Sequence, residues 1–186
     1  MTPEEREHLY RVREHARCLF TWREVEQAVD RVAGEIRDAC RDRDPLLLTV
    51  MNGGLVFAGL LLPRLDFPLQ CGYVHATRYR GETTGAELDW NVPPCGVEGR
   101  HVLLLDDILD VGTTLCALVE RCEQQGAASV ATAVLVDKRH HRKATPGLRA
   151  DHTALETEDF YLFGCGMDYR EYWRNAPGIY AVVEEE

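Results

Sequence analysis

The sequence predicts an α/β fold whose mostly parallel central sheet is flanked by helices. Residues 46–50, 102–105 and 130–136 are short, mostly apolar runs. The run at 102–105 has no polar alternation, as expected for a strand that is covered on both faces of a parallel sheet. After Thr114 apolar residues recur at helical spacing, so a helix directly follows this strand, as in α/β proteins.

The other elements follow in chain order. Residues 3–43 are charged and helix-forming, and their apolar positions fit two amphipathic helices. Thr21 is a candidate N-cap of the second helix, because Glu24 follows it three residues later. After the first core strand we expect, in order, a tight loop at 51–54, an apolar helix at 55–62 that Pro63 ends, a strand at 71–76, a polar connection at 77–99, and then the two later strands.

The polar connection at 77–99 contains six glycines and prolines. A connection of this length inside a compact domain is usually a lid or a flexible hairpin. We therefore expect a lid that is mobile without ligand and ordered when substrates bind.

Composition narrows the class of protein. A chain of 186 residues with 45% hydrophobic content can bury the core of one domain. The net charge of −10 argues against non-specific binding to nucleic acid or to an anionic membrane. The chain has neither an apolar stretch of membrane-spanning length nor a signal-peptide pattern, so we expect a cytoplasmic protein. Its seven cysteines lack metal-knuckle spacing, and reduced, buried thiols are expected.

Three carboxylates and a glycine-threonine turn follow the strand at 102–105 without a spacer. Open α/β sheets bind ligands outside the carboxyl ends of their strands. A turn that begins a helix attracts phosphate through unpaired N–H groups and the helix dipole. Asp106 and Asp107 suit ribose hydroxyls or Mg²⁺, and Asp110 would face the other reactant. Gly112 allows close approach of the backbone to the ligand, and the hydroxyl groups of Thr113 and Thr114 can donate to phosphate oxygens. The segment therefore predicts a phosphate-sugar site.

This segment resembles the phosphoribosyl pyrophosphate motif of the type I phosphoribosyltransferases. In that motif an apolar strand precedes two acids, two apolar residues, Asp, Thr or Ser, Gly, any residue and Thr. Val111 departs from it, so one side-chain contact to the 5′-phosphate is missing and backbone amides would supply the cradle. The alternative is an ordinary strand-turn-helix with a solvated acidic loop. Crowded carboxylates repel one another unless a cation is bound, which favours the ligand site.

The last third of the chain resembles the purine-recognising part of the hypoxanthine-guanine phosphoribosyltransferases. The resemblance rests on Lys138 after an apolar strand, on the segment 160–169, and on the segment 171–174. It implies a single phosphoribosyltransferase domain with an N-terminal helical segment at 1–43 and a small hood with base-binding residues at 150–186. It also implies a homo-oligomer, either a dimer or a tetramer.

The same resemblance assigns roles to individual residues. It assigns the exocyclic oxygen of the purine to Lys138, base stacking to Tyr161 beside Leu162, Mg²⁺ to Asp168, and pyrophosphate to Arg174. Asp106 and Asp107 are further Mg²⁺ candidates from their carboxylate chemistry.

Lys138 also has a direct chemical interpretation. An ammonium group can donate to a 6-oxo group but finds no acceptor on a 6-amino group, so it selects hypoxanthine or guanine over adenine. The alternative is a surface lysine within the basic run at 138–143. His140 and His141 in this run suggest a metal site, but other ligands at useful spacing are missing, and we expect a solvated loop.

The other purine-site assignments have structural alternatives as well. Phe160 is adjacent to Tyr161, and either aromatic ring could simply pack in the core. Asp168 could be the N-cap of a final helix. Arg174 could be a surface charge, although an acidic protein that binds pyrophosphate must place cations locally.

Two loops depart from the family pattern. The family commonly has Leu-Lys-Gly after the first core strand, often with a strained cis peptide that turns an amide toward pyrophosphate. Here the loop at 51–54 carries Asn52 in place of the lysine, followed by Gly53, so only the backbone contact can survive. In the lid, the family's Ser-Tyr pair is Arg78-Tyr79. We expect Arg78 and Arg80 to approach pyrophosphate when the lid closes and so to compensate for the missing lysine, a compensation that is not a feature of the family.

The combined hypothesis is purine salvage. It is Mg²⁺-dependent transfer of a phosphoribosyl group from phosphoribosyl pyrophosphate to N9 of a 6-oxopurine, with Asp110 accepting or holding the N7 proton. Two alternatives stay open: a regulator on the same fold that binds nucleotides or RNA without catalysis, and a related enzyme that uses xanthine or a pyrimidine.

Overall fold

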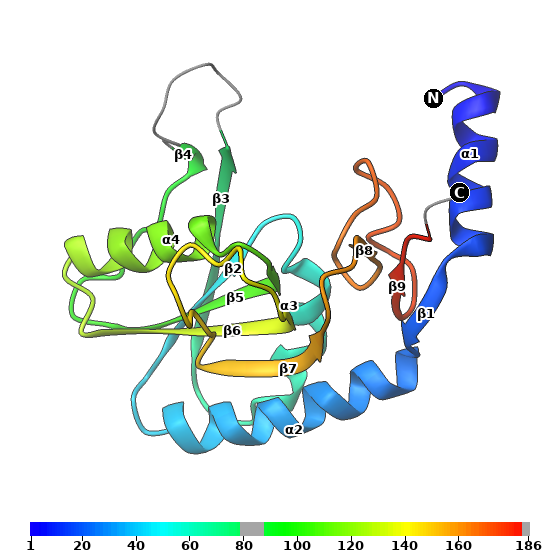
Figure 1. Cartoon of the computed structure of the whole chain (residues 1–186). Helices are drawn as coiled ribbons and strands as arrows, with labels where there is room; N and C mark the ends of the chain where they lie inside the picture. Colours follow the sequence, from blue (N-terminus) through cyan, green and yellow to red (C-terminus); the bar gives the residue numbers. More distant parts are fainter. Residues whose placement is uncertain (79–87, 184–186) are drawn as a thin grey trace.

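The computed structural model describes the backbone of residues 1–78 and 88–183. Its centre is a six-stranded sheet with the order β4-β3-β2-β5-β6-β7 (Figure 1). All neighbouring strands are parallel except β4, which pairs antiparallel with β3. The strands are β2 (Leu46–Val50), β3 (Gln70–Arg78), β4 (Leu88–Val92), β5 (His101–Leu109), β6 (Ser129–Lys138) and β7 (His152–Thr157). The predicted fold class is confirmed.

Helices cover both faces of this sheet. α2 (Trp22–Cys40) and α3 (Leu55–Leu61) lie on one face, and α4 (Thr113–Gln124) lies on the other (Figure 1). Leu103 and Leu105 of β5 belong to the core on the α2 side, whereas Leu104 belongs to the core on the α4 side. Apolar residues are therefore needed at successive positions of β5, because both of its faces are buried.

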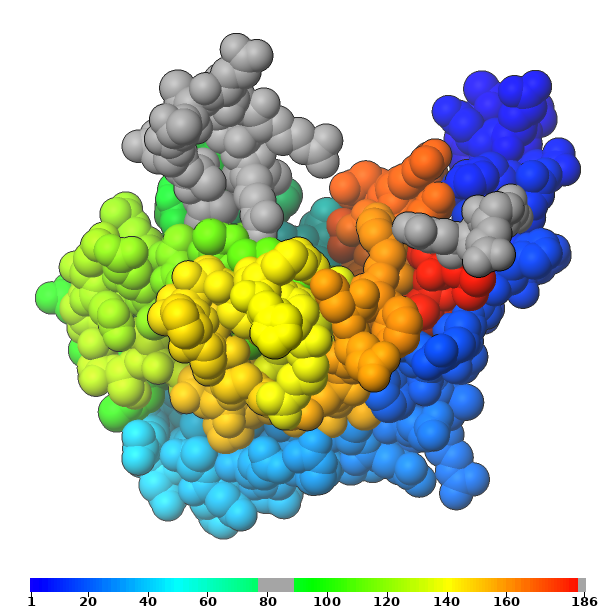
Figure 2. All heavy atoms as spheres, viewed as in Figure 1, coloured from blue at the N-terminus to red at the C-terminus, as the bar shows by residue number. Residues whose placement is uncertain are grey.

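A second, smaller sheet forms the hood. It consists of β1 (Arg17–Phe20), β9 (Ile179–Ala181) and β8 (Leu162–Phe163), paired antiparallel in that order. α1 (Pro3–His15) precedes β1 and stands at the outer end of the hood (Figures 1 and 2). Its attachment includes a hydrogen bond of 2.9 Å from Trp173 Nε1 to the carbonyl oxygen of Leu9.

Several sequence expectations need correction. Residues 3–43 hold two helices as predicted, with Thr21 and Glu24 forming the expected capping box, but β1 separates the helices. The α3 helix ends at Leu61, and Pro63 lies in a following 3₁₀ turn, η1 (Leu62–Arg64). The connection at 77–99 contains β4, which pairs antiparallel with β3, so the hairpin expected there as one alternative is present. The expected mobility of a lid falls on residues 79–87, which lie outside the described part of the chain, and stays a prediction.

The predicted state of the cysteines is correct only in part. All seven are free thiols, but only Cys122 and Cys165 are buried, whereas Cys18, Cys71 and Cys95 are exposed. Within the described part of the chain, none of the helices has the length and apolar character that a membrane crossing requires.

Candidate functional site

The acidic pair lies in the carboxyl half of β5, rather than after it. The strand continues to Leu109 because it stays paired with β6 up to Asp137. Asp107 is buried and Asp106 is half-buried, and the backbone N–H of Asp107 donates to Asp106 Oδ1 over 2.9 Å. Neither carboxylate forms an ion pair with any residue that the structure describes. The pair thus lacks a cationic ion-pair partner within the described part of the chain.

Burial makes these carboxylates harder to ionise. It raises the pKa of Asp106 well above its usual value, and the charge of Asp107 raises it further. Burial also raises the pKa of Asp107, opposed by a hydrogen bond to Asp106 and by the positive charge of Arg174. A bound cation would remove this penalty, because it favours the charged form of both groups.

The loop after β2 packs directly against the acidic pair. A Cβ atom at Gly53 would lie 2.2 Å from Asp107 Oδ2, so any larger residue there would displace the Asp107 carboxylate. A Cβ atom at Gly166 would lie 2.1 Å from the carbonyl oxygen of Gly53. The peptide bond between Met51 and Asn52 is cis, as the family resemblance implied. The structure therefore brings Asn52 and Gly53 to the acidic pair, with the Asn52 side chain exposed.

The glycine-threonine turn begins α4, as predicted. Gly112 has a φ of 89° and precedes the first helical residue, Thr113, with Thr114 after it. Its lack of a side chain is also a packing requirement, because a Cβ atom would lie 2.4 Å from Leu148 Cδ2. Gly112 provides no side-chain cap, so a helix N-terminus, where a phosphate is favoured, lies directly after the acidic strand.

The turn is supported from outside by the segment 139–151, which follows β6. The N–H of Ala144 donates to the carbonyl oxygen of Val111 over 2.8 Å, and Lys143 Nζ donates to the carbonyl oxygen of Leu109 over 2.7 Å. In Figure 2 the yellow residues after β6 cover this part of the surface, next to the green α4. Val111 therefore contributes through its backbone to the shape of the turn.

A hollow of about 190 Å³ lies beside the acidic pair. Its lining residues come from β5, β6 and the hood, and they are Asp107, Ile108, Asp110, Lys138, Tyr161, Leu162, Met167 and Asp168. Residues that are distant in the sequence and were assigned to purine recognition thus share one hollow. Lys138 is only 7% exposed, so the surface-lysine alternative is wrong.

The two adjacent aromatic residues differ in environment. Tyr161 is 54% exposed and lines the hollow. Its ring meets that of Tyr169 edge-on, with 5.7 Å between the ring centroids. Phe160 is partly buried and packs against the core. Of the two aromatic residues, Tyr161 is therefore the one whose ring is exposed at the hollow, whereas Phe160 has a packing role.

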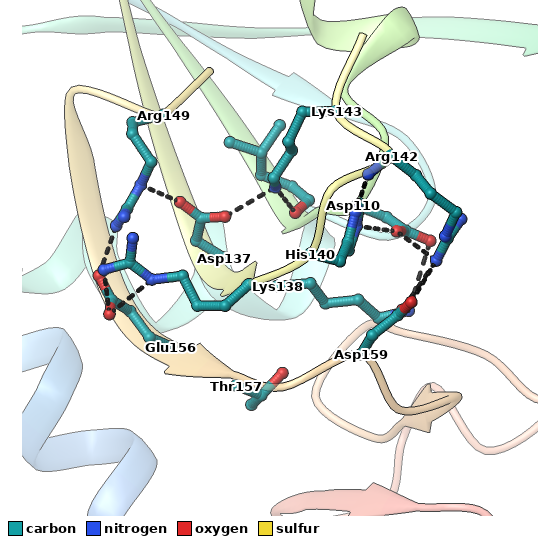
Figure 3. A network of polar contacts seen from close by, with 12 residues as sticks. Asp110, Asp137, Lys138, His140, Arg142, Lys143, Arg149, Glu156, Thr157 and Asp159 are labelled. Atoms are coloured by element: carbon teal, nitrogen blue, oxygen red, sulfur yellow. Dashed lines mark hydrogen bonds and ion pairs between the residues drawn. The ribbon is translucent and has the colours of Figure 1, made fainter. Parts of the chain in front are cut away.

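Asp110 is held in a network of cations and hydrogen-bond donors (Figure 3). Its Oδ1 lies 2.7 Å from His140 Nε2, and its Oδ2 lies 3.4 Å from Lys138 Nζ. Lys138 Nζ lies 3.6 Å from Asp159 Oδ1, and Asp159 also pairs with Arg142 over 2.7 Å. The expected solvated loop is therefore correct for the exposed His141 but wrong for His140.

A second network is centred on Asp137, which is fully buried at the end of β6 (Figure 3). Lys143 Nζ lies 2.8 Å from its Oδ1, and Arg149 Nε lies 2.6 Å from its Oδ2. Arg149 also pairs with Glu156 of β7. Sequence reasoning missed this network, although a buried carboxylate followed by a basic run was a signal that its partners lie in that run.

The last loop brings Asp168 and Arg174 together. Arg174 lies 2.7 Å from Asp168 Oδ1 and donates to the carbonyl oxygen of Gly166 over 2.8 Å. Asp168 Oδ2 accepts a hydrogen bond of 2.8 Å from the N–H of Glu171, so it closes a turn. The N-cap alternative is wrong, because no helix follows Asp168 in the described residues. The expectations for the Arg78 side chain, for Tyr79 and for Arg80 fall outside the described part of the chain.

A comparison with protein families identifies the architecture. The family described as "Phosphoribosyl transferase domain" matches residues 15–169 of the 186. The chain belongs to the phosphoribosyltransferase family. Only α1 and the end of the hood lie outside the matched range.

Similar phosphoribosyltransferases extend over nearly the whole chain. The chain is 31% identical to the hypoxanthine-guanine phosphoribosyltransferase of Bacillus subtilis, over 88% of this chain and 91% of the relative. It is 29% identical to the hypoxanthine-guanine-xanthine phosphoribosyltransferase of Tritrichomonas foetus, over 88% and 89% respectively. The structure of a variant hypoxanthine phosphoribosyltransferase from Trypanosoma cruzi with the product IMP gives a TM-score of 0.83 at 26% identity, covering 91% of this chain and 93% of that one. The resemblance stated from the sequence is confirmed.

Proposed function

We propose that this phosphoribosyltransferase transfers the phosphoribosyl group of phosphoribosyl pyrophosphate to N9 of hypoxanthine or guanine, giving IMP or GMP and pyrophosphate. One observation carries the proposal. The carboxyl ends of β5 and β6 bring the helix-initiating turn, the acidic pair and the hollow with Lys138 to one edge of the sheet. This edge is where an α/β sheet binds ligands, and it offers separate positions for phosphate, sugar and base.

The acidic side of the site fits Mg²⁺. Asp106 and Asp107 are carboxylates whose burial opposes ionisation, and Asp168 is close enough to raise the pKa of Asp107 further. Oxygen ligands with excess negative charge are the donor set that Mg²⁺ prefers. Asp106, Asp107 and Asp168 would hold the ion, and its charge would offset the negative charge that grows on the departing pyrophosphate. Arg174, paired with Asp168, adds a cation at the same place.

The hollow supports recognition of a 6-oxopurine. Lys138 lies at the end of β6 with its ammonium between Asp110 and Asp159, where it can donate to the oxygen on C6 of a purine. Tyr161 presents its ring to the flat base from the hood. Asp110 lines the same hollow, with its Oδ2 next to Lys138, and accepting the N7 proton there would keep N9 nucleophilic. As the C1′–N9 bond forms and the bond from C1′ to pyrophosphate breaks, the proton would pass from N7 to the Asp110 carboxylate, and pyrophosphate would leave.

The test is an assay of four bases with phosphoribosyl pyrophosphate and Mg²⁺, in which pyrophosphate and nucleotide are both quantified. We expect equal amounts of the two products with hypoxanthine and guanine, and little with adenine. Xanthine is the fourth base, because Lys138 recognises an oxygen that xanthine shares. Binding of phosphoribosyl pyrophosphate without base-dependent release of pyrophosphate would favour the non-catalytic regulator.

A further inference from the structure

His140 is a buried histidine at the site with no part in the proposed chemistry. Its side chain is 5% exposed, and it lies in the segment that follows β6, next to Asp110 (Figure 3). Burying an imidazole is unfavourable unless its ring nitrogens have hydrogen-bond partners. Both nitrogens of His140 have one, and together these partners determine what the ring does.

The backbone determines which nitrogen of His140 carries hydrogen. Nδ1 lies 3.0 Å from the backbone nitrogen of Arg142, whose N–H donates to it. A nitrogen that accepts a hydrogen bond carries no hydrogen, so the hydrogen of the neutral ring is on Nε2. Nε2 lies 2.7 Å from Asp110 Oδ1 and donates to it. His140 is thus a fixed donor that the segment after β6 aims at one oxygen of Asp110.

We infer that His140 is a positioning residue that holds the Asp110 carboxylate with Oδ2 directed to the purine. This inference rests on the proposed function, because it concerns the group proposed to receive the N7 proton. Oδ1 is engaged by His140, which leaves Oδ2 on the side of Lys138 and the hollow. A carboxylate has two equivalent oxygens and a rotating side chain, so its direction must be fixed by a partner.

The competing partner of Asp110 is Arg142. Its guanidinium lies 3.8 Å from Asp110 Oδ1, on the exposed side of the network, and is already paired with Asp159. Without the donor from His140, Asp110 is free to turn toward Arg142 and away from the hollow. The catalytic carboxylate would then be present but misdirected, which lowers the rate of the chemical step more than substrate affinity.

The same side chains do not form a metal site. Asp110, His140 and Asp159 offer ligand atoms within 4.8 Å of one another. However, Lys138 and Arg142 already bring two positive charges to these carboxylates, and the Nδ1 and Nε2 atoms of His140 are both engaged. A third cation at this place would be repelled by the two cations in contact with its ligands.

The test compares His140→Leu, which removes the donor, with His140→Gln, whose amide restores one. We expect His140→Leu to lower kcat about 10- to 100-fold, the effect of losing a hydrogen bond to a charged group. KM for phosphoribosyl pyrophosphate should change less than about twofold, because the acidic pair and the turn are untouched. His140→Gln should recover most of kcat. The exposed neighbour provides the matched control, and His141→Leu should keep full activity.

A second arm asks whether His140 acts through Asp110. In an Asp110→Asn background, His140→Leu should cause no further loss of kcat, because the group it positions is already absent. An equal loss in both backgrounds, or a His140→Leu enzyme with normal kcat, would overturn the inference. If His140→Leu fails to fold by circular dichroism, His140→Glu, equal in size to glutamine but without the donor, replaces it. A wild-type protein with no transferase activity would instead refute the proposed function itself.

Discussion

Two groups of carboxylates lie at the same edge of the sheet and differ in whether the protein supplies them with ion-pair partners. Asp106 and Asp107 on β5 are enclosed without an ion-pair partner among the described residues. Asp110 and Asp137 are surrounded by Lys138 at the end of β6 and by the basic segment after it, which contributes the hydrogen-bond donor His140 and the cations Lys143 and Arg149. The first group is left incompletely neutralised, and the second is neutralised by the protein itself.

The difference follows from the substrate that each group of carboxylates is proposed to bind. Phosphoribosyl pyrophosphate arrives as an anion with Mg²⁺, so the carboxylates that face it gain their cation from the substrate complex. A purine base arrives neutral and brings no counterion. The groups that recognise it must therefore already be oriented by the protein, which is the role of the network in Figure 3.

The largest expected effect is that of Asp110→Asn. The amide keeps the shape of the carboxylate but cannot accept the N7 proton, so kcat should fall about 10²- to 10⁴-fold. Affinity for phosphoribosyl pyrophosphate should hardly change. Steady-state and single-turnover rates measure both quantities, and the exposed Asp38→Asn serves as a control. A near-normal rate of the chemical step would remove Asp110 from the role of base.

Asp137→Asn should be the most destabilising single change in the paired group. It leaves Lys143, whose side chain is buried, without its anion, and breaking a buried pair costs about 3–5 kcal/mol of unfolding free energy. Urea unfolding measures this loss. Glu156→Gln breaks an exposed pair with Arg149 and should cost no more than about 1 kcal/mol. Similar losses in the two variants would show that burial of Asp137 does not govern the stability of this network.

Lys138→Met should selectively lower the catalytic efficiency of the enzyme with 6-oxopurines. Loss of a charged hydrogen bond to O6 should lower kcat/KM for hypoxanthine and guanine by roughly 1.5–3 kcal/mol, and discrimination against adenine should shrink. Arg139→Met, at the exposed neighbouring position, is the matched control. Unchanged kcat/KM for both oxopurines would separate Lys138 from base recognition, despite its burial.

Asp106→Asn should have the smallest effect, and it should stabilise the folded protein instead of impairing it. The pKa of Asp106 is raised in the folded protein, mainly by burial, so the folded state binds a proton more tightly than the unfolded state. The Asp106 side chain therefore stabilises the folded state at low pH. This stabilisation is lost as the pH rises from about 3.9, the pKa of an aspartate in the unfolded chain, through the higher pKa in the folded protein.

In EDTA at pH 7, Asp106→Asn should therefore raise Tm by a few degrees, given that about 1 kcal/mol shifts Tm by about 2–4 °C in a domain of this size. The gain should shrink near pH 4. Asp42→Asn, whose side chain is 92% exposed, should leave Tm unchanged. A gain of equal size at both pH values would contradict the electrostatic cause.

The sequence was most informative where the signal was local. The apolar run of β5, the glycine before α4 and the helical spacing after Thr114 lie within one short segment, so the strand, the turn and the helix were predicted in the right order, although β5 continues to Leu109 instead of ending at Leu105. The sheet of the hood was harder to predict from the sequence, because Arg17 of β1 pairs with Ala181 at the other end of the chain. Strands of two to four residues are also too short to show a periodicity.

The role of His140 could not be predicted for a related reason. Its partner Asp110 is 30 residues away in the sequence, on another strand end. Within the basic run the histidine has only charged and polar neighbours, a pattern typical of a solvated loop. Its burial follows from the way the segment 139–151 folds back over the turn before α4, through Val111 and Leu109.

The central claim is that Asp106 and Asp107 bind phosphoribosyl pyrophosphate with Mg²⁺, whereas Asp110 serves the base. It is tested most directly by calorimetric titration of phosphoribosyl pyrophosphate into the wild-type protein and into Asp110→Asn, each in Mg²⁺ and in EDTA. Both proteins should bind equally tightly in Mg²⁺, and both should lose at least about tenfold in affinity, about 1.4 kcal/mol, in EDTA. Binding that is as tight in EDTA as in Mg²⁺, or binding that Asp110→Asn abolishes, would contradict this claim.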